Sequence, residues 1–243
     1  PATRFDDITF VQQQITSRTK AILLVTPSNP TGHVLDDALL QAYALLARKN
    51  RIALILDETY SDFIPYQPHR LFQDPSWEQT LVHIMSFGKT FALTGYRAGL
   101  LLAAPDTIRE GLKIQDTMTV CQPRLTQYAI QYGLCNLATW VRERRDDVLG
   151  RHQYFKDLFS VQELPFQLHA SGSFFAWVTH PFQGMDSFNA SRIMAEQHGV
   201  LTLPGAAFGP GNEAYIRLAL GNVPLTQVPM VIERLRAITG TNP

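Results

Sequence analysis

Short runs of consecutive apolar residues recur through the first half of the chain, and each ends in a polar or glycine-containing turn. Apolar runs of strand length that do not alternate with polar residues are typical of strands buried on both faces of a sheet. Helical spacing of apolar residues follows Asp36 and again follows Pro105. The pattern predicts an α/β fold with a mostly parallel central sheet flanked by helices, whose strands cover residues 21–25, 52–56, 81–85 and 100–104.

A further helix is predicted to begin near Pro123, and Gly133 within it predicts a break. The charged run at residues 142–147 lies on another predicted helix, which continues to Phe159. The composition changes in this helix. We therefore predict two domains, a large one over residues 1–145 and a small one over residues 146–243.

The second domain alternates short strand-like runs with helical patterns, which predicts a small α+β domain at the C-terminal end. Its predicted strands cover residues 166–170, 174–178, 200–203 and 215–220, and its predicted helices cover residues 187–198 and 224–238.

Composition narrows the functional classes. The chain has 243 residues and a formal net charge of +0, so no nucleic-acid or membrane partner is expected. Its apolar runs are too short to span a bilayer, and Cys121 and Cys135 form neither a disulfide framework nor a metal-binding spacing. The 7 histidines are scattered along the sequence, which predicts no metal site. A cytoplasmic protein is expected.

Polar residues follow the apolar runs at the positions where the predicted strands end. Asn29, Asp57, Ser86 and Lys89 all lie there. The carboxyl ends of parallel strands meet at one edge of a sheet, where α/β proteins place their sites. We therefore expect these four side chains to converge.

Lys89 lies in a glycine-punctuated turn between two predicted core strands, with Arg97 close behind it. A lysine that is partly removed from water can act as an amine nucleophile. The alternative is a surface turn with a solvated lysine and arginine, and the turn alone does not decide between them.

Four segments of the sequence, taken together, decide between a functional lysine and a surface turn. In order they are Asn29-Pro30-Thr31-Gly32, Asp57-Glu58-Thr59-Tyr60, Ser86 with Lys89, Gly95, Arg97 and Gly99, and Tyr215-Ile216-Arg217-Leu218. The set resembles the fold-type I pyridoxal-phosphate (PLP) enzymes, and specifically the class I/II aminotransferases. A lone Asn-Pro-Thr-Gly is a common turn, but the ordered set is specific, and the resemblance covers nearly the whole chain.

The resemblance implies a role for each residue that would contact the cofactor. Lys89 would be the Schiff-base lysine and would carry the proton that leaves the substrate Cα. Asp57 would lie against the pyridine nitrogen and keep it protonated. Tyr60 and Asn29 would hydrogen-bond the 3-oxygen of the ring. Asp57 as a helix N-cap and Tyr60 as a core aromatic are the structural alternatives.

The same resemblance implies which residues would hold the phosphate and the substrate. Ser86 and Arg97 would hold the phosphate, and Arg217 would grip the substrate α-carboxylate, with Asn29 also at the substrate. Ser86 could instead be a turn residue, and Arg217 a strand residue facing solvent.

The resemblance also leaves functions open. The family's glycine-rich phosphate turn and its ring-stacking aromatic have no candidate, so we expect the chain to be the C-terminal two thirds of a longer protein. The implied reaction moves an amino group between an amino acid and a 2-oxo acid, in a homodimer. A PLP-dependent lyase or synthase of the same fold, or a truncated non-catalytic domain, are the alternatives.

Overall fold

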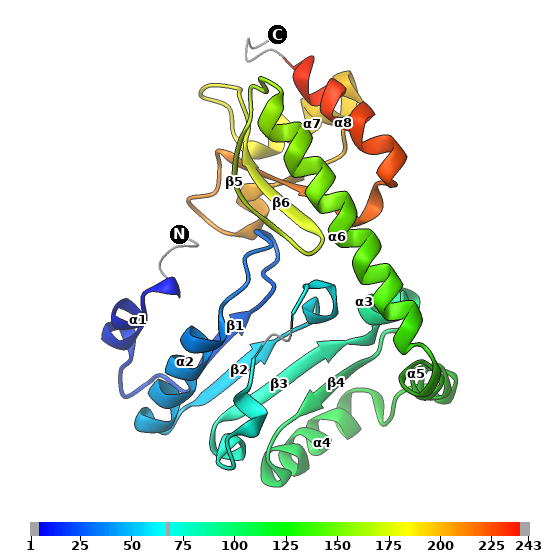
Figure 1. Ribbon diagram of the computed structural model, residues 1–243. Coiled ribbons are helices and arrows are strands. Elements are labelled where there is room, and N and C mark those ends of the chain that lie inside the picture. Colours follow the sequence, from blue (N-terminus) through cyan, green and yellow to red (C-terminus); the bar gives the residue numbers. More distant parts are fainter. Residues whose placement is uncertain (1–4, 67–68, 239–243) are drawn as a thin grey trace. The chain divides into compact units, whose positions relative to one another are not determined.

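The computed structural model describes residues 5–66 and 69–238 (Figure 1). Two compact units make up the chain. The first comprises Pro1–Pro27 and Val34–Arg144, and the second comprises Ser28–His33 and Arg145–Pro243. The short segment Ser28–His33 therefore groups with residues more than a hundred positions away in the sequence, and each unit is described separately below.

The first unit is an α/β unit whose strands form a single sheet in the order β1-β2-β3-β4. β1 pairs with β2 and β2 with β3 in parallel, whereas β3 and β4 are antiparallel. The mostly parallel sheet predicted from the apolar runs is confirmed. Its elements are α1 (Ile8–Gln14), β1 (Ala21–Val25), α2 (Asp37–Asn50), β2 (Ala53–Asp57), β3 (Leu81–Ser86), α3 (Phe87–Thr90), β4 (Gly99–Leu102), α4 (Pro105–Thr119) and α5 (Arg124–Asn136).

Helix α2 packs its apolar stripe on the sheet. Asp36 caps its N-terminus, where the side chain accepts a hydrogen bond from Leu39 N at 2.7 Å. Leu40 and Tyr43 of the helix are fully buried against Leu54 and Leu56 of β2 in one apolar cluster. Because β2 alternates its faces, these two leucines define the face of the strand that α2 covers.

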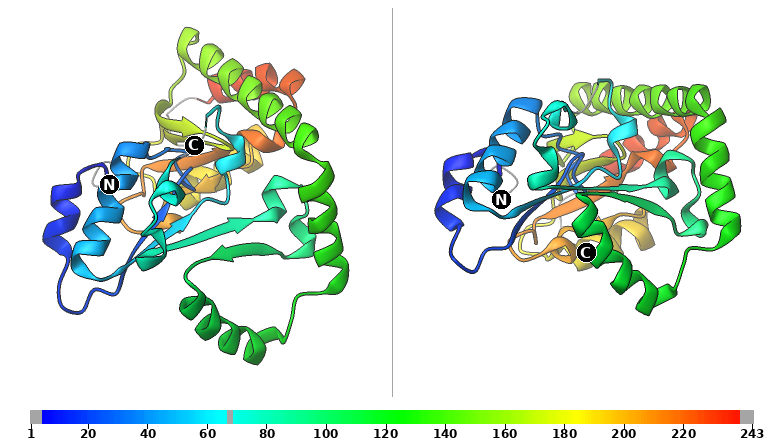
Figure 2. Two further views of the ribbon diagram at one scale, coloured as in Figure 1. Left: turned by 60° about the horizontal axis from the view of Figure 1, so that its bottom comes forward. Right: turned by 90° about the horizontal axis from the view of Figure 1, so that it is seen from below.

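Strand β4 differs from the prediction that all four strands are buried. Leu100, Leu101 and Leu102 are 41%, 47% and 38% exposed. The reason is that β4 is the last strand of the described sheet and has β3 as its only strand neighbour there. Figure 2 shows α1 and α2 at the β1 side of this sheet and α4 beyond β4.

Helix α5 runs unbroken through Gly133, so the predicted break is wrong. The glycine has a packing role instead. A Cβ atom at this position would lie 2.8 Å from the ring of Phe91, so only a residue without a side chain lets the ring lie against the helix.

The second unit contains an antiparallel sheet in the order β5-β6-β8-β7, as an α+β unit requires. The 24-residue helix α6 leads into it from the first unit. Its other elements are β5 (Gln167–Gly172), β6 (Phe175–Thr179), α7 (Ser187–His198), β7 (Leu203–Pro204), β8 (Tyr215–Ala219) and α8 (Val228–Arg236), and α6 spans Ala138–Val161.

Two elements of this unit are shorter than predicted. The strand expected over residues 200–203 is reduced to β7, because Val200 N still bonds Met194 O at the end of α7. The helix expected over residues 224–238 begins only at Val228, because a tight turn precedes it, in which Gln227 N donates to Pro224 O.

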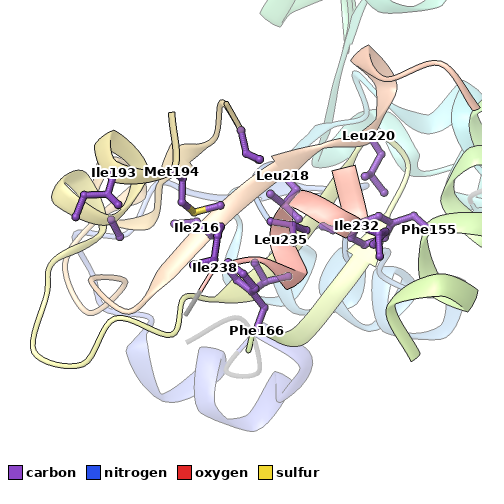
Figure 3. Packing of buried hydrophobic residues seen from close by; sticks show 14 of the residues in the cluster. Phe155, Phe166, Ile193, Met194, Ile216, Leu218, Leu220, Ile232, Leu235 and Ile238 are labelled. Atoms are coloured by element: carbon purple, nitrogen blue, oxygen red, sulfur yellow. The ribbon is translucent and has the colours of Figure 1, made fainter. Parts of the chain in front are cut away.

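The core of the second unit joins its sheet to its helices. Ile216 and Leu218 of β8 lie against Ile232 and Leu235 of α8, and Phe155 of α6 closes the same cluster (Figure 3). Alternate residues of β8 enter this core, so the residue between them, Arg217, is directed to the opposite face of the sheet.

Among residues 5–66 and 69–238, no helix combines the length and the apolar composition needed to cross a bilayer.

Candidate active site

Five of the sequence-predicted site residues belong to the first unit and the other two to the second. In the first unit they lie at the carboxyl ends of β2 and β3 or in the turn that follows β3. Asp57 is the last residue of β2, and Ser86 is the last residue of β3. The two strands are parallel neighbours, so both residues lie at the same sheet edge, as predicted.

The Asp57 carboxylate is held by a turn of its own chain. Its Oδ1 accepts hydrogen bonds from Thr59 N at 3.0 Å and from Thr59 Oγ1 at 2.7 Å. No group in the described part of the chain donates to its Oδ2, and the side chain is only half-buried. A carboxylate with one fixed oxygen and one available oxygen can accept a proton or an N–H from a ligand.

Lys89 and Tyr60 are brought together from two strand ends. The Lys89 amine lies 5.7 Å from the centroid of the Tyr60 ring, and Tyr60 is buried. The next residue, Thr90, donates from Oγ1 to Asp62 Oδ2 at 2.6 Å, which ties the lysine turn to the segment that carries Tyr60. The aromatic face thus holds the amine at a half-buried position.

Ser86 and Arg97 flank the lysine turn on its two sides. Ser86 pairs with Gly99 across the β3–β4 ladder, and a Cβ atom at Gly99 would lie 2.5 Å from Met85 O. Arg97 is exposed in a left-handed conformation, with φ 52°, and donates to Thr94 O at 3.2 Å. The exposed guanidinium is placed by its own turn.

In the second unit, Arg217 and Asn29 contact each other directly. Arg217 Nη1 donates to Asn29 Oδ1 at 2.6 Å. The guanidinium carbon lies 4.4 Å from the centroid of Phe175 and 5.2 Å from that of Phe208, so two aromatic rings hold the plane of the group. Phe175 is itself buried and supports this arginine as well.

The loop that carries Asn29 depends on a close approach between two glycines. Gly32 has φ +74°, and a Cβ atom there would lie 2.3 Å from Gly172 N of β5. A Cβ atom on Gly172 would in turn lie 2.2 Å from Gly32 O. The glycine of the Asn-Pro-Thr-Gly segment is therefore required by the contact with β5, which positions Asn29 beside Arg217.

Sequence reasoning missed a buried polar cluster in the first unit. Glu58 Oε2 contacts His69 Nε2 at 2.8 Å and His83 Nε2 at 2.7 Å. Burial opposes ionisation of this carboxyl, but the two imidazole donors outweigh it and hold the pKa of Glu58 below its ordinary value. The only signal in the sequence was that His83 lies two residues after Leu81 in a predicted strand, which puts both side chains on the same face.

A comparison with protein-family models identifies the family. Residues 4–235 match the model of class I and II aminotransferases, which is nearly the whole chain. The chain belongs to the class I and II aminotransferases. This is a family of PLP-dependent transaminases, so the resemblance drawn from the four sequence segments is confirmed.

Curated aminotransferases are similar over most of this chain. A putative aminotransferase YugH of Bacillus subtilis is 33% identical over 207 residues, which is 84% of this chain and 53% of that protein. An aspartate aminotransferase of Pyrococcus abyssi is 30% identical over 86% of this chain and 54% of its own length. The chain thus spans about half the length of the curated aminotransferases it matches.

Solved aminotransferase structures share the fold. An aromatic aminotransferase from Pyrococcus horikoshii matches with a TM-score of 0.83 and 26% identity, over 95% of this chain and 62% of that one. The aspartate aminotransferase of Thermus thermophilus with maleate matches with a TM-score of 0.83 and 25% identity, over 94% of this chain and 59% of that one. Both agree with the fold predicted from the sequence.

The residues of the first unit fit the family's cofactor. PLP carries an aldehyde, a pyridine nitrogen and a phosphate, which call for an amine, a carboxylate and cationic or hydroxyl donors. The unit offers the Lys89 amine, the available Oδ2 of Asp57, and the side chains of Ser86 and Arg97 around one turn. The chemistry of this set matches the three groups of the cofactor.

Proposed function

We propose that this chain carries the lysine, the ring-nitrogen partner and the carboxylate-binding arginine of an aminotransferase that moves an amino group between an amino acid and a 2-oxo acid. The observation that carries the proposal is the Lys89 amine facing Tyr60, 5.7 Å from its ring centroid, in the unit where Asp57 ends the neighbouring strand. PLP, when bound, supplies the electron sink that lets the substrate Cα lose its proton.

Lys89 has two tasks in this proposal. Its Nζ would hold the cofactor through the aldehyde carbon, with the aldehyde oxygen leaving as water, and once freed by a substrate amine the same Nζ would carry the proton that leaves the substrate Cα. Tyr60 supports both tasks, because its ring holds the amine in place and its hydroxyl is assigned to the ring oxygen of the cofactor.

Asp57 is assigned to the pyridine nitrogen. Its Oδ2 would accept the N–H there and would keep the nitrogen protonated, since a carboxylate stabilises the cationic form of a neighbouring base. Ser86 and Arg97 are assigned to the phosphate through charge-assisted hydrogen bonds.

Arg217 and Asn29 are assigned to the substrate. The planar guanidinium of Arg217 presents paired N–H donors that match a carboxylate, and Phe175 and Phe208 hold its plane. The Thermus thermophilus relative with maleate, a dicarboxylate, supports carboxylate recognition by this fold. Asn29, which accepts from Arg217, is also assigned to the 3-oxygen of the cofactor ring.

The proposal is tested by covalent trapping. The chain is incubated with PLP, reduced with borohydride and digested, and the modified residue is located by mass spectrometry. Stoichiometric modification of Lys89, lost in Lys89→Ala and unchanged in a Lys113→Ala control on the exposed face of α4, supports the proposal. Labelling spread over exposed lysines, or none, contradicts it and favours a non-catalytic domain.

The reaction type is tested separately from cofactor attachment. Loaded protein is given single amino acids with and without a 2-oxo acid. Formation of a new 2-oxo acid that depends on the added acceptor identifies transamination. Release of ammonia without an acceptor identifies lyase chemistry instead, since the same cofactor residues serve both reactions.

A further inference from the structure

The cluster of Glu58, His69 and His83 lies in the first unit, directly next in sequence to Asp57. Both imidazoles contact the same carboxylate oxygen, Oε2 of Glu58, at 2.8 Å and 2.7 Å. The side chains of Glu58 and His69 are each 3% exposed and that of His83 is 7% exposed. The ring of Phe72 packs against both imidazoles, with centroid distances of 5.7 Å and 5.3 Å, and shields the cluster from water.

The hydrogen-bond network assigns the proton positions. Leu71 N donates to His69 Nδ1 at 3.2 Å, so this nitrogen carries a lone pair and the ring proton is on Nε2. His69 therefore donates to Glu58. Because the carboxylate is held ionised by its donors, His83 donates through its Nε2 to the same oxygen.

The same proton positions disfavour a metal ion, although the three ligand atoms lie within 4.8 Å of one another. A metal bound to Nε2 of His69 would move the ring proton to Nδ1, where it would point at the N–H of Leu71. His83 Nδ1 is buried and has no hydrogen-bond partner among residues 5–66 and 69–238, so a proton displaced there would also lack an acceptor within them. Metal-bound histidines normally donate from the second nitrogen to such an acceptor. The polar atoms of the cluster are therefore better satisfied when the two imidazoles donate protons to Glu58 than when they bind a metal ion.

The cluster fixes the backbone at the end of β2. Glu58 N donates to Ile84 O of β3 at 2.9 Å, and the Glu58 side chain reaches His83 of the same strand. Leu56, two residues before Glu58, is the register partner of His83, so Glu58 lies on the α2-covered face. Successive side chains of a strand point to opposite faces, which directs Asp57 away from that face.

We propose that Glu58, held by His69 and His83, is the positioning residue that sets the direction of the Asp57 carboxylate. The inference rests on the role of Asp57 in the proposed function, but it concerns residues to which that function assigns no contact with the cofactor. Anchoring of Glu58 by its side chain on the buried face leaves the preceding residue, Asp57, little rotational freedom, as a ligand-binding carboxylate requires.

The first test needs no cofactor. Hydrogen exchange is measured at the amide of Thr59, which bonds Asp57 Oδ1, in the wild type, Glu58→Ala, Glu58→Gln and Leu54→Ala. Glu58→Ala is expected to speed exchange at Thr59 by about tenfold or more relative to the amides of β2. Glu58→Gln keeps an oxygen that accepts from both imidazoles and is expected to restore most of the protection.

Leu54→Ala is the matched control. Leu54 is fully buried in the same strand, so its truncation destabilises the unit without touching the anchor. It is expected to leave the exchange of Thr59 relative to its neighbours unchanged. Equal relative exchange at Thr59 in Glu58→Ala and Leu54→Ala would overturn the proposal, because it would reduce Glu58 to a stability residue.

The second test uses protein loaded with PLP. The midpoint pH of the cofactor's absorbance change is recorded for Glu58→Ala, Asp57→Asn and the double variant. If Glu58 acts through Asp57, Glu58→Ala alone shifts the midpoint by about one pH unit or more from the wild-type value. Added to Asp57→Asn, it causes no further shift. Additive shifts would overturn the proposal.

The two tests separate the possible failures. If the wild type takes up no PLP, the proposed function fails for this chain, and amide exchange at Thr59 still decides the role of Glu58. Elemental analysis covers the remaining alternative. Stoichiometric zinc in the purified protein, lost in His69→Ala and His83→Ala, would overturn the hydrogen-bonded assignment and replace it with a metal site.

Discussion

Arg217 donates from Nη1 to Oδ1 of Asn29 at 2.6 Å, across 188 positions of sequence. Both residues were predicted to contact bound ligand, and they prove to be hydrogen-bond partners within the second unit. A guanidinium has five N–H donors, so one bond to an amide oxygen and two aromatic contacts orient it for a planar anion. The pair therefore connects the Asn-Pro-Thr-Gly segment to the arginine that we propose binds the substrate.

Replacement of Arg217 by lysine is expected to weaken carboxylate binding by at least about tenfold, because a point-charge ammonium loses the paired donors. The measurement is calorimetric titration of the PLP-loaded protein with maleate. Arg192→Lys, an exposed arginine on α7, serves as the control and should bind as the wild type does. Equal affinities for both variants would remove Arg217 from the binding site.

Replacement of Gly32 by alanine is expected to destabilise the second unit by about 2 kcal/mol or more, since the new Cβ would meet the backbone of β5 at 2.3 Å and φ is +74°. Urea denaturation measures the loss. Gly184→Ala separates the two causes, because Gly184 has φ +71° and nothing within 4 Å of its Cβ position. If both variants lose the same stability, the close approach to β5 contributes nothing.

Gly133→Ala is expected to destabilise the first unit, although alanine favours helices, because its Cβ would lie 2.8 Å from the Phe91 ring. Phe91→Leu should relieve part of that loss in the double variant, as expected for residues in contact. Gly111→Ala in α4 has open space at its Cβ and should stabilise by about 0.5–1 kcal/mol. Thermal unfolding of these four variants measures the changes in stability. If the losses of Gly133→Ala and Phe91→Leu simply add in the double variant, the two residues are not in energetic contact.

Mild acid is expected to destabilise the second unit through His152. Burial, and then the charge of Lys156, lower the pKa of His152 from 6.5 to about 4. The unfolded chain therefore binds more protons between these values. The contribution of neutral His152 to the free energy of unfolding is complete above pH 6.5 and is lost as the pH falls toward 4. The total loss in unfolding free energy is about 3 kcal/mol.

His152→Leu tests this pH dependence, because both imidazole nitrogens are buried without partners in the described chain and an apolar side chain replaces them without a lost bond. Unfolding free energies measured from pH 7 to pH 4.5 should flatten in the variant. A slope equal to that of the wild type would assign the acid sensitivity to other groups.

The positions of Asp57 and Ser86 at one edge of the sheet could be predicted from the sequence because the signals are local. An apolar run that ends in Asp57 or Ser86 predicts a strand end whichever strands lie beside it, and parallel strands put those ends together. Gly32 could be recognised as part of a turn, but its contact with Gly172 could not, because the two lie far apart in the sequence. The exposed β4 was missed for the same reason, since burial depends on neighbours as well as on composition.

By itself, the sequence determined the order of the helices and strands, the family, and the residue types around the lysine turn, because each depends on short segments with their own spacing and capping. Only the tertiary structure decided that β4 runs antiparallel at a sheet edge, that Arg217 holds Asn29, and that His69 and His83 meet on Glu58. Those relationships join residues from separate elements. Their free energy comes from packing and hydrogen bonds that exist only after the chain has folded.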